Sequence, residues 1–285
     1  MDISVVGAGR VGTALAVLWG RAGHRIVAVS GGAATAERAG RHLPGVRVLE
    51  PEGSVADAEV VVIATPDSAI RPVCERIAGA LRSDASVAHA SGASGLDALD
   101  AAAAVGASTL ALHPYQTCPT VEAAVERMAG ATFAVTARDE RGYALGERLA
   151  LDAGGRPFRI ADELKPMYHA SAVFASNYLV TVTALAEELA REAGVPDPAG
   201  ALALLQEATL ANIRRVGPAE ALTGPAVRGD ALTLRRNIET LAERVPDAVR
   251  PYVVLADLAV VLAERSGRLP AHGREAVQEV LAWWR

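Results

Sequence analysis

Near its start the sequence reads Ile3-Ser4-Val5-Val6-Gly7-Ala8-Gly9-Arg10-Val11-Gly12, a short apolar run that leads directly into a GxGxxG motif. A helical pattern follows, from about residue 10 to residue 22. This arrangement is typical of a dinucleotide site: Gly7 permits a tight turn, Gly9 lets a pyrophosphate approach the backbone, and Gly12 permits close helix–strand packing. The helix N-terminus adds free N–H groups and a positive dipole. We therefore expect the cofactor to bind at Gly7, Ala8, Gly9, Arg10, Val11 and Gly12.

Working outward from this turn, strand and helix patterns alternate over the first half of the chain. Strands are predicted at 3–6, 24–30, 46–49, 59–64, 86–90, 109–112, 133–136 and 157–160, and helices at 10–22, 35–43, 70–81 and 139–153. Such alternation implies a parallel sheet with right-handed crossovers. Beyond Asp162 only helical patterns remain, at 165–192, 199–216, 232–244, 251–265 and 274–284. The sequence predicts an α/β fold, with a Rossmann-type parallel sheet over residues 1–161 and an all-helical domain over residues 162–285.

Composition narrows the classes of partner. The 285 residues are 51% hydrophobic and carry a formal net charge of −5, which does not favour binding to nucleic acid. The two cysteines, Cys74 and Cys118, form no motif, so a reduced cytoplasmic protein without a metal site is expected. The longest uncharged stretch, residues 170–186, is too polar and slightly too short for a membrane span.

The end of the second predicted strand indicates which cofactor is bound. Sites for NAD usually place an acidic residue there to accept hydrogen bonds from the ribose. Here the position is near Ser30, two glycines follow, and no acidic residue appears before Glu37. A small hydroxyl residue with Arg10 and Arg38 nearby suits a 2′-phosphate, so the sequence favours NADP over NAD.

Other polar residues follow later strands and should reach the same carboxyl edge of the sheet, where ligands bind. Thr65 and Pro66 follow the fourth strand, and Ser91 lies in the segment His89-Ala90-Ser91-Gly92 after the fifth. We expect all three to line the cofactor, although Thr65-Pro66 also reads as a simple strand-ending turn. His113 and Gln116, after the sixth strand, are candidates for substrate binding. A histidine packed in the core is the alternative for His113.

Lys165 is the single lysine among 28 basic residues and stands at the start of the first long helix. Unlike arginine, an ammonium group can lose its proton, and reduction of a carbonyl needs a proton donor for the developing alkoxide. At 100° per residue His169 and Ser176 share its stripe, and Asn177 lies off it. We predict that Lys165 and His169 are catalytic and that Ser176 and Asn177 contact substrate. The alternative for Lys165 and His169 is that they belong to the start of an ordinary surface helix and have no catalytic role.

A dense loop, Leu222-Thr223-Gly224-Pro225-Ala226-Val227-Arg228-Gly229-Asp230, separates two of the predicted helices. Arg228 could pair with a substrate carboxylate through two hydrogen bonds. Asp230 is a second candidate for substrate binding, and the alternative for it is a cap on the following helix.

Together these motifs resemble those of a bacterial family that joins a Rossmann-like domain to a C-terminal helical domain of unknown function. The resemblance rests on residues 7–12, on His113-Pro114-Tyr115-Gln116-Thr117, on Lys165 with Tyr168-His169-Ala170 and Ser176-Asn177-Tyr178, and on Thr223-Gly224-Pro225 with Arg228-Gly229-Asp230. It places the chain in the wider group of 6-phosphogluconate dehydrogenase, ketopantoate reductase and pyrroline carboxylate reductase. It also implies a homodimer formed through the helical domain. In ketopantoate reductases an asparagine follows the helix lysine by one turn, and His169 stands there in this chain.

The sequence therefore predicts an NADP-dependent oxidoreductase that reduces a small anionic 2-oxo acid, with ketopantoate as the first substrate to test. The alternatives are an imine reductase of the pyrroline carboxylate reductase type and an NADP-binding regulatory protein without turnover.

Overall fold

The computed structural model describes residues 1–285 apart from the side chains of residues 271 and 272. The chain divides into two compact units, Met1–Asn177 and Tyr178–Arg285. The first unit includes the helix α8 (Lys165–Ala175), because the start of that helix is bonded to loops of the sheet domain. The domain boundary predicted at 161/162 marks the end of the strands, whereas the compact units separate sixteen residues later.

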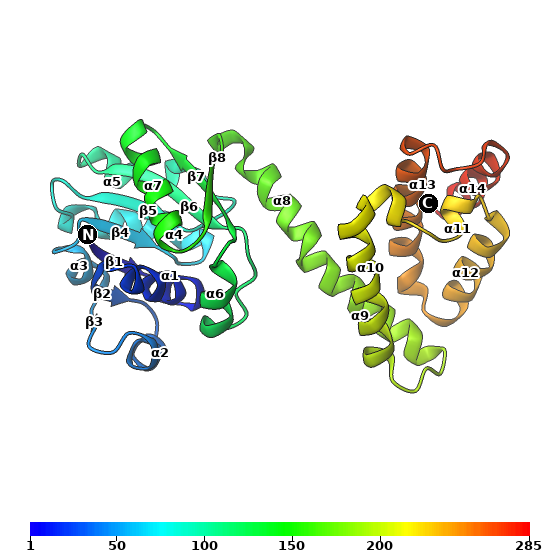
Figure 1. Cartoon of the computed structure of the whole chain (residues 1–285), viewed down its shortest axis with the longest axis horizontal. Coiled ribbons are helices and arrows are strands. Elements are labelled where there is room, and N and C mark those ends of the chain that lie inside the picture. The colour runs from blue at the N-terminus through cyan, green and yellow to red at the C-terminus, as the bar shows by residue number, and fades with distance from the viewer. The chain divides into compact units, whose positions relative to one another are not determined.

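The first unit is built on one eight-stranded sheet in the order β3-β2-β1-β4-β5-β6-β7-β8 (Figure 1). All neighbouring strands are parallel except β6 and β7, which pair antiparallel, for example Leu112 with Val135. The strand order places the switch point between β1 and β4, as in dinucleotide-binding sheets. The strands are β1 Asp2–Val6, β2 Arg25–Ser30, β3 Arg47–Val48, β4 Val60–Ile63, β5 Ser86–His89, β6 Ser108–Pro114, β7 Thr132–Ala137 and β8 Arg156–Arg159.

Helices cover both faces of this sheet. Side chains alternate along each strand, so Val5 of β1 joins one apolar core and Val6 joins the other. The first core is closed by α1 (Arg10–Arg21), α2 (Thr35–His42), α6 (Val121–Met128) and α7 (Glu140–Asp152). The second is closed by α3 (Pro51–Val55), α4 (Asp67–Ile77) and α5 (Asp100–Ala104). Single-turn 3₁₀ helices lie at η1 Ala78–Ala80, η2 Leu96–Leu99 and η3 Asp162–Leu164.

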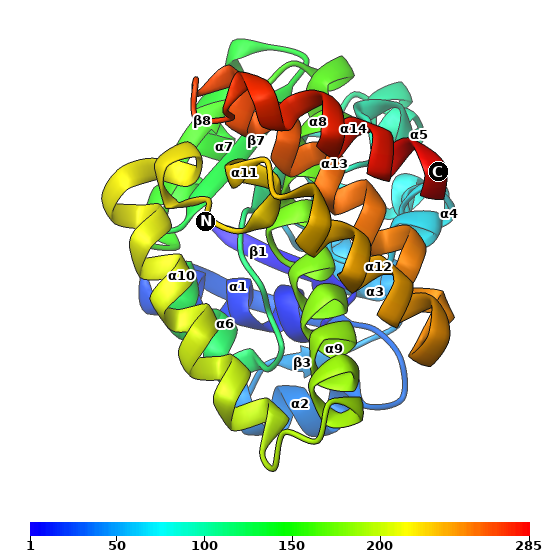
Figure 2. The same cartoon turned by 90° about the vertical axis from the view of Figure 1, so that its right-hand side faces the viewer.

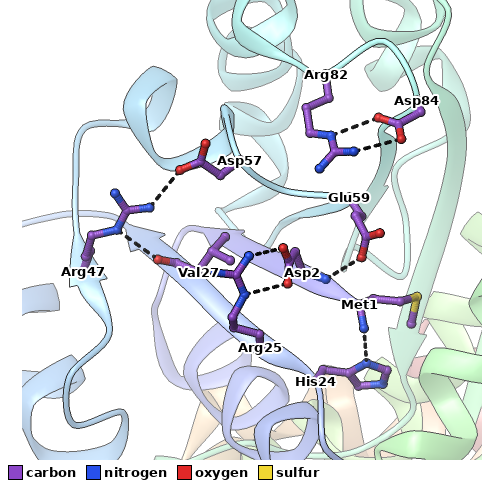
Figure 3. Close-up of polar contacts among 10 residues, drawn as sticks. All are labelled: Met1, Asp2, His24, Arg25, Val27, Arg47, Asp57, Glu59, Arg82 and Asp84. Atoms are coloured by element: carbon purple, nitrogen blue, oxygen red, sulfur yellow. Dashed lines mark hydrogen bonds and ion pairs between the residues drawn. The ribbon is translucent and has the colours of Figure 1, made fainter.

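Ion pairs close the edge of the sheet where β1, β2 and β4 begin (Figure 3). The Arg25 guanidinium makes two bonds to Asp2 and holds the pKa of that carboxyl below its usual range. The Asp2 N–H donates to Glu59 at 2.7 Å, and Arg47 donates to Asp57 at 3.1 Å. Polar groups at the starts of these strands are thus bonded to other residues of the chain. A ligand has better access at the opposite edge, where the parallel strands end.

The second unit is helical (Figure 2). Its apolar core lies among α11 (Pro225–Arg228), α12 (Ala231–Arg244), α13 (Val249–Arg265) and α14 (Ala271–Trp284), with the 3₁₀ turn η4 at Pro246–Ala248. Before them come α9 (Asn177–Glu192) and α10 (Pro198–Ala221), neither of which has a buried residue. Ser176 leaves helical geometry and divides the predicted helix 165–192 into α8 and α9. Among the described residues, no helix is both long and apolar enough to cross a membrane.

Candidate functional site

The turn between β1 and α1 has the geometry that a bound dinucleotide requires. Gly7 adopts φ +95°, and a Cβ added there would lie 2.6 Å from the Thr65 backbone nitrogen. A Cβ added at Gly12 would lie 2.5 Å from the Gly7 carbonyl oxygen. At Gly9 the nearest atom would be 3.9 Å away, so space remains above this residue. Gly7 and Gly12 are thus fixed by packing, and Gly9 leaves the backbone open to a ligand.

Ser30 holds this turn through its backbone. Its carbonyl oxygen accepts from the N–H groups of Gly7 and Ala8 at 2.8 and 2.9 Å, and its side chain is buried. The helical hydrogen bonds of α1 begin at the Thr13 N–H, which donates to the Gly9 carbonyl. The preceding N–H groups, of Arg10, Val11 and Gly12, belong to the first helical turn and have no helical acceptor. Free N–H groups at a helix N-terminus are of the kind that binds anions.

A cleft of about 330 Å³ is lined by residues of α1, α2 and α6. Its charged and titratable side chains are the basic Arg10, Arg38, Arg41 and His42 and the acidic Glu37 and Glu122, which lie beside Arg41 and His42 respectively. Arg38 donates to the Ala8 carbonyl at 2.8 Å, which ties it to the glycine-rich turn. Arg41 and His42 each have a carboxylate partner, whereas no ion pair with a carboxylate is found for Arg10 or Arg38 among the described residues. Arg41 and His42 were not foreseen from the sequence, since their position on α2 becomes informative only once the helix is placed.

Lys165 is buried, with 1% of its surface exposed. Its Nζ donates to the Ser91 carbonyl at 3.0 Å, in the loop that follows β5. Burial lowers the pKa of this ammonium to about 8, although the carboxylates of Asp162 and Asp67 act in the opposite direction. Lysine is almost never fully buried unless it is paired, so a buried lysine at the carboxyl edge of the sheet is a candidate catalytic group.

The loop after β5 is held in place from both ends. The Ser91 hydroxyl accepts from the backbone N–H groups of Ala93 and Ser94 at 3.2 and 2.9 Å. At the far end, both Asp162 oxygens accept from the Leu96 N–H, at 3.2 and 3.1 Å. Asp162 therefore positions the loop that Lys165 contacts. The sequence did not predict this role.

Three of the six histidines gather around Lys165. His89 is fully buried on β5, and burial together with the charge of Lys165 lowers its pKa to about 3. The pKa of His113, on β6, is lowered to about 4. Burial is the largest cause, followed by the charges of Lys165 and His169. The rings of His113 and His169 lie 6.4 Å apart. His89 and His113 are therefore neutral at physiological pH.

Aromatic side chains surround this group. The Tyr168 hydroxyl lies 2.9 Å from Nδ1 of His113, and its ring stacks on Tyr115 with centroids 4.8 Å apart. Burial raises the pKa of Tyr168, so the phenol keeps its proton. The sequence pointed to Tyr168 only as part of a family motif and gave it no role.

The remaining predicted residues lie in several places. Thr65 and Pro66 follow β4, and the Thr65 hydroxyl is buried without a hydrogen-bond partner among the described residues. Gln116 is exposed and accepts from the Thr117 N–H. Ser176 ends α8, about 16 Å along the helix from Lys165, and Asn177 is the first residue of α9.

Arg228 and Asp230 belong to the second unit. Arg228 is exposed on α11. Both Asp230 oxygens are engaged by Thr233, through its N–H at 3.0 Å and its hydroxyl at 2.7 Å. Asp230 therefore caps α12, as the alternative reading of the loop anticipated, and its contact with a substrate stays a prediction. No cluster of metal-ligating side chains occurs in the part of the chain whose side chains are described.

Comparison with solved structures shows a shared fold. A Bacteroides fragilis protein described as a candidate NADP oxidoreductase is 24% identical, with a TM-score of 0.76, over 91% of this chain and 97% of its own. Thermotoga maritima protein TM1727 is 23% identical, with a TM-score of 0.72, over 93% and 100%. Plasmodium falciparum pyrroline carboxylate reductase, solved with NADP bound, is 12% identical, with a TM-score of 0.60, over 92% and 98%.

Two family models each match a part of the chain, and the second match begins just before β7, inside the first compact unit. A search of curated proteins found no significant match. Residues 1–114 match the model of a Rossmann-like domain. Residues 131–259 match the model of a domain of unknown function, DUF2520. The chain thus joins a Rossmann-like domain to a C-terminal DUF2520 domain.

Proposed function

We propose that this protein is an NADPH-dependent reductase of a small anionic 2-oxo acid. The observation that carries the proposal is the buried Lys165 ammonium, bonded to the loop after β5 at the sheet edge that also bears the glycine-rich turn. The names of several structural relatives, an NADP oxidoreductase and an NADP-bound pyrroline carboxylate reductase among them, support the reaction class.

The residues present fit the cofactor. The open space above Gly9 and the first-turn N–H groups of α1 suit a pyrophosphate. The cleft lined by Arg10 and Arg38 suits a 2′-phosphate, which supports NADP over NAD. Thr65, Pro66 and Ser91 complete the predicted cofactor-binding set from the neighbouring strand ends. Some relatives are solved with NAD or named as NAD-dependent, so the choice of cofactor is part of the proposal.

In this mechanism NADPH, when bound, supplies a hydride to the carbonyl carbon of the substrate. Lys165 gives a proton from Nζ to the oxygen on which negative charge develops. Its lowered pKa of about 8 leaves it protonated at neutral pH yet able to release the proton. Asp162 keeps the Ser91 loop in place, and His169, one helical turn after Lys165, is proposed to support the proton donor. Arg228 is proposed to pair with the substrate carboxylate, and Gln116, Ser176 and Asn177 are further candidate substrate contacts.

A second candidate, an imine reductase, is favoured by the names of other relatives. A Streptomyces aurantiacus imine reductase is 18% identical, with a TM-score of 0.57. Imine reduction needs the same hydride geometry, but its product nitrogen is basic and depends less on a lysine acid.

The test is to follow NADPH oxidation with ketopantoate and with a cyclic imino acid side by side, using NADH in parallel. Oxidation that is faster with NADPH and with the keto acid supports the proposal, whereas selective turnover of the imine replaces it with the second candidate. Tight NADPH binding without oxidation by any keto acid or imine tested would favour a non-catalytic binding protein instead. In Lys165→Ala, turnover should be lost while the Kd for NADPH is retained. Unchanged turnover in that variant would remove Lys165 from the mechanism.

A homodimer through the helical domain is also part of the proposal. It is supported by α9 and α10, which bury no residue within a single chain. Both helices also expose large apolar side chains, such as Val180 and Leu204, and exposed apolar surface of this kind favours a covering partner.

A further inference from the structure

The His113 ring is held from two sides. The Gly92 backbone packs against it so closely that a Cβ added at Gly92 would lie 2.8 Å from Cε1. The Tyr168 hydroxyl lies 2.9 Å from Nδ1. These contacts leave Nε2 as the ring nitrogen with no hydrogen bond to any of the described residues. The direction of the Tyr168–His113 hydrogen bond therefore decides whether Nε2 carries a proton.

Tyr168 is itself positioned by its surroundings. Its ring packs against Tyr115 and Phe158, with centroids 4.8 and 5.8 Å away. The Ser171 hydroxyl donates to the Tyr168 carbonyl at 2.6 Å, so its only proton is used there. Tyr115 must then donate its own proton to the Ser171 oxygen, 2.7 Å away. Tyr115 thus has its own partner, and among the described residues His113 is the hydrogen-bond partner of the Tyr168 hydroxyl.

We propose that Tyr168 donates its phenolic hydrogen to Nδ1 of a neutral His113 and so fixes the proton of that imidazole on Nε2, where it donates a hydrogen bond to the substrate oxygen. Tyr168 is then a positioning residue that acts through His113. The proposal rests on the reductase function above. It assigns proton transfer to Lys165 and a fixed hydrogen bond to His113. As the new C–H bond forms, Lys165 transfers its proton to the oxygen, and His113 keeps its Nε2 proton throughout.

The electrostatics around His113 agree with these separate roles. Burial and the charge of Lys165 both oppose a second proton on His113, whose pKa is lowered to about 4. The phenol of Tyr168 has a raised pKa and so does not ionise near neutral pH. A neutral imidazole is a weak acid and stabilises a developing oxyanion as a fixed donor, while the ammonium of Lys165 is the better acid.

The decisive measurement is the tautomer of His113, read from long-range proton–nitrogen NMR correlations of the full chain labelled with ¹⁵N-histidine. His113→Gln identifies the resonance. We expect the wild type to carry the proton on Nε2. Tyr168→Phe should lose this preference and show a mixture of tautomers. The control Tyr115→Phe removes a hydroxyl that does not contact His113 and should keep the wild-type tautomer.

A proton on Nδ1 in the wild type would overturn the proposal, and this reading needs no variant to fold. An unchanged tautomer in Tyr168→Phe would overturn it as well. In kinetics, Tyr168→Phe should lower kcat about three- to tenfold, as expected for loss of one neutral hydrogen bond, with the Kd for NADPH unchanged. An Nε2 tautomer fixed by Tyr168 in a protein that reduces no substrate would overturn the reductase function alone. Turnover with the Nδ1 tautomer would overturn the role of Tyr168 alone.

Discussion

Lys165 is the proposed proton donor, so its protonation should control the rate. Its pKa is lowered to about 8 by burial, against the opposing influence of Asp162 and Asp67. His89 and His113, with pKa values of about 3 and 4, are already neutral above pH 6. Because the donor must carry a proton, we expect kcat to fall as pH rises through about 8. Initial rates between pH 6 and 10 check this, and a rate that stays level up to pH 10 would contradict it.

The same burial should cost stability. The unfolded chain keeps the ordinary pKa of 10.5 and so binds the proton more tightly than the folded chain. Between about pH 8 and 10.5 the unfolded state binds more protons, so the free energy of unfolding should rise with pH across that window. Lys165→Met removes the buried charge but also the bond to Ser91. We expect a net gain on the order of 2 kcal/mol at pH 7 that shrinks towards pH 10. Urea denaturation at both pH values measures it, and a less stable variant would refute it.

Arg38 is the residue whose loss should change cofactor selectivity. It lines the basic cleft and donates to the Ala8 carbonyl. Removing one charge-assisted bond to a 2′-phosphate should raise the Kd for NADPH about tenfold in Arg38→Ala. The Kd for NADH should change much less, and it reports any damage to the glycine-rich turn. Arg21→Ala, an exposed change at the far end of α1, serves as the control. Equal weakening of both cofactors would argue against a phosphate contact.

At the scale of the element, two glycines of the β1–α1 turn should respond in different ways to the same added methyl group. At Gly12 a Cβ would meet the Gly7 carbonyl at 2.5 Å, so Gly12→Ala should destabilise the fold by about 1–3 kcal/mol. At Gly9 the space is open, so Gly9→Ala should leave Tm nearly unchanged and weaken NADPH binding at least about tenfold. Thermal denaturation and fluorescence titration of the two variants provide the comparison. Equal losses of stability would contradict it.

The elements show which sequence signals are reliable. Each predicted strand of the first half has its counterpart. For most of them the signal is a buried apolar run, which is strong locally, whereas β3 and β8 are mostly exposed and were located by the turns around them. The short helices α3, α5 and α6 were not predicted, since five to eight residues give little periodicity. The antiparallel pairing of β7 with β6 was also missed, because alternation of strand and helix does not fix strand direction when the connection turns back on itself. Local patterns thus specify elements better than their pairing.

The same distinction between local signals and long-range contacts applies to the residues of the candidate site. Gly7, Gly9 and Gly12 could be assigned because their roles depend on neighbours in sequence. Lys165 stood out by composition alone. Asp162 and Tyr168 could not be assigned, because their partners, Leu96 and His113, lie 66 and 55 residues away in the chain. Contacts of this kind arise only when α8 and the ends of β5 and β6 come together in the folded unit.

For the whole molecule, the open question is what covers the long helices of the second unit. Leu204 and Leu205 on α10 are 72% and 62% exposed, and the helix has no buried residue. Apolar surface of this kind usually marks an interface, and a second copy of the chain is the partner we propose. We expect the wild type to have the mass of a dimer in size-exclusion chromatography with light scattering at micromolar concentration.

Paired substitutions test this assembly. Leu204→Glu together with Leu205→Glu places charges in the proposed interface and should shift the protein towards the monomer mass, because an uncompensated buried charge opposes association. Val105→Glu is the matched control: Val105 is 51% exposed in the first unit, next to the sheet and not on α10. It should leave the dimer intact. A wild type of monomer mass, or a double variant that remains dimeric, would mean that α10 is not covered by a second copy.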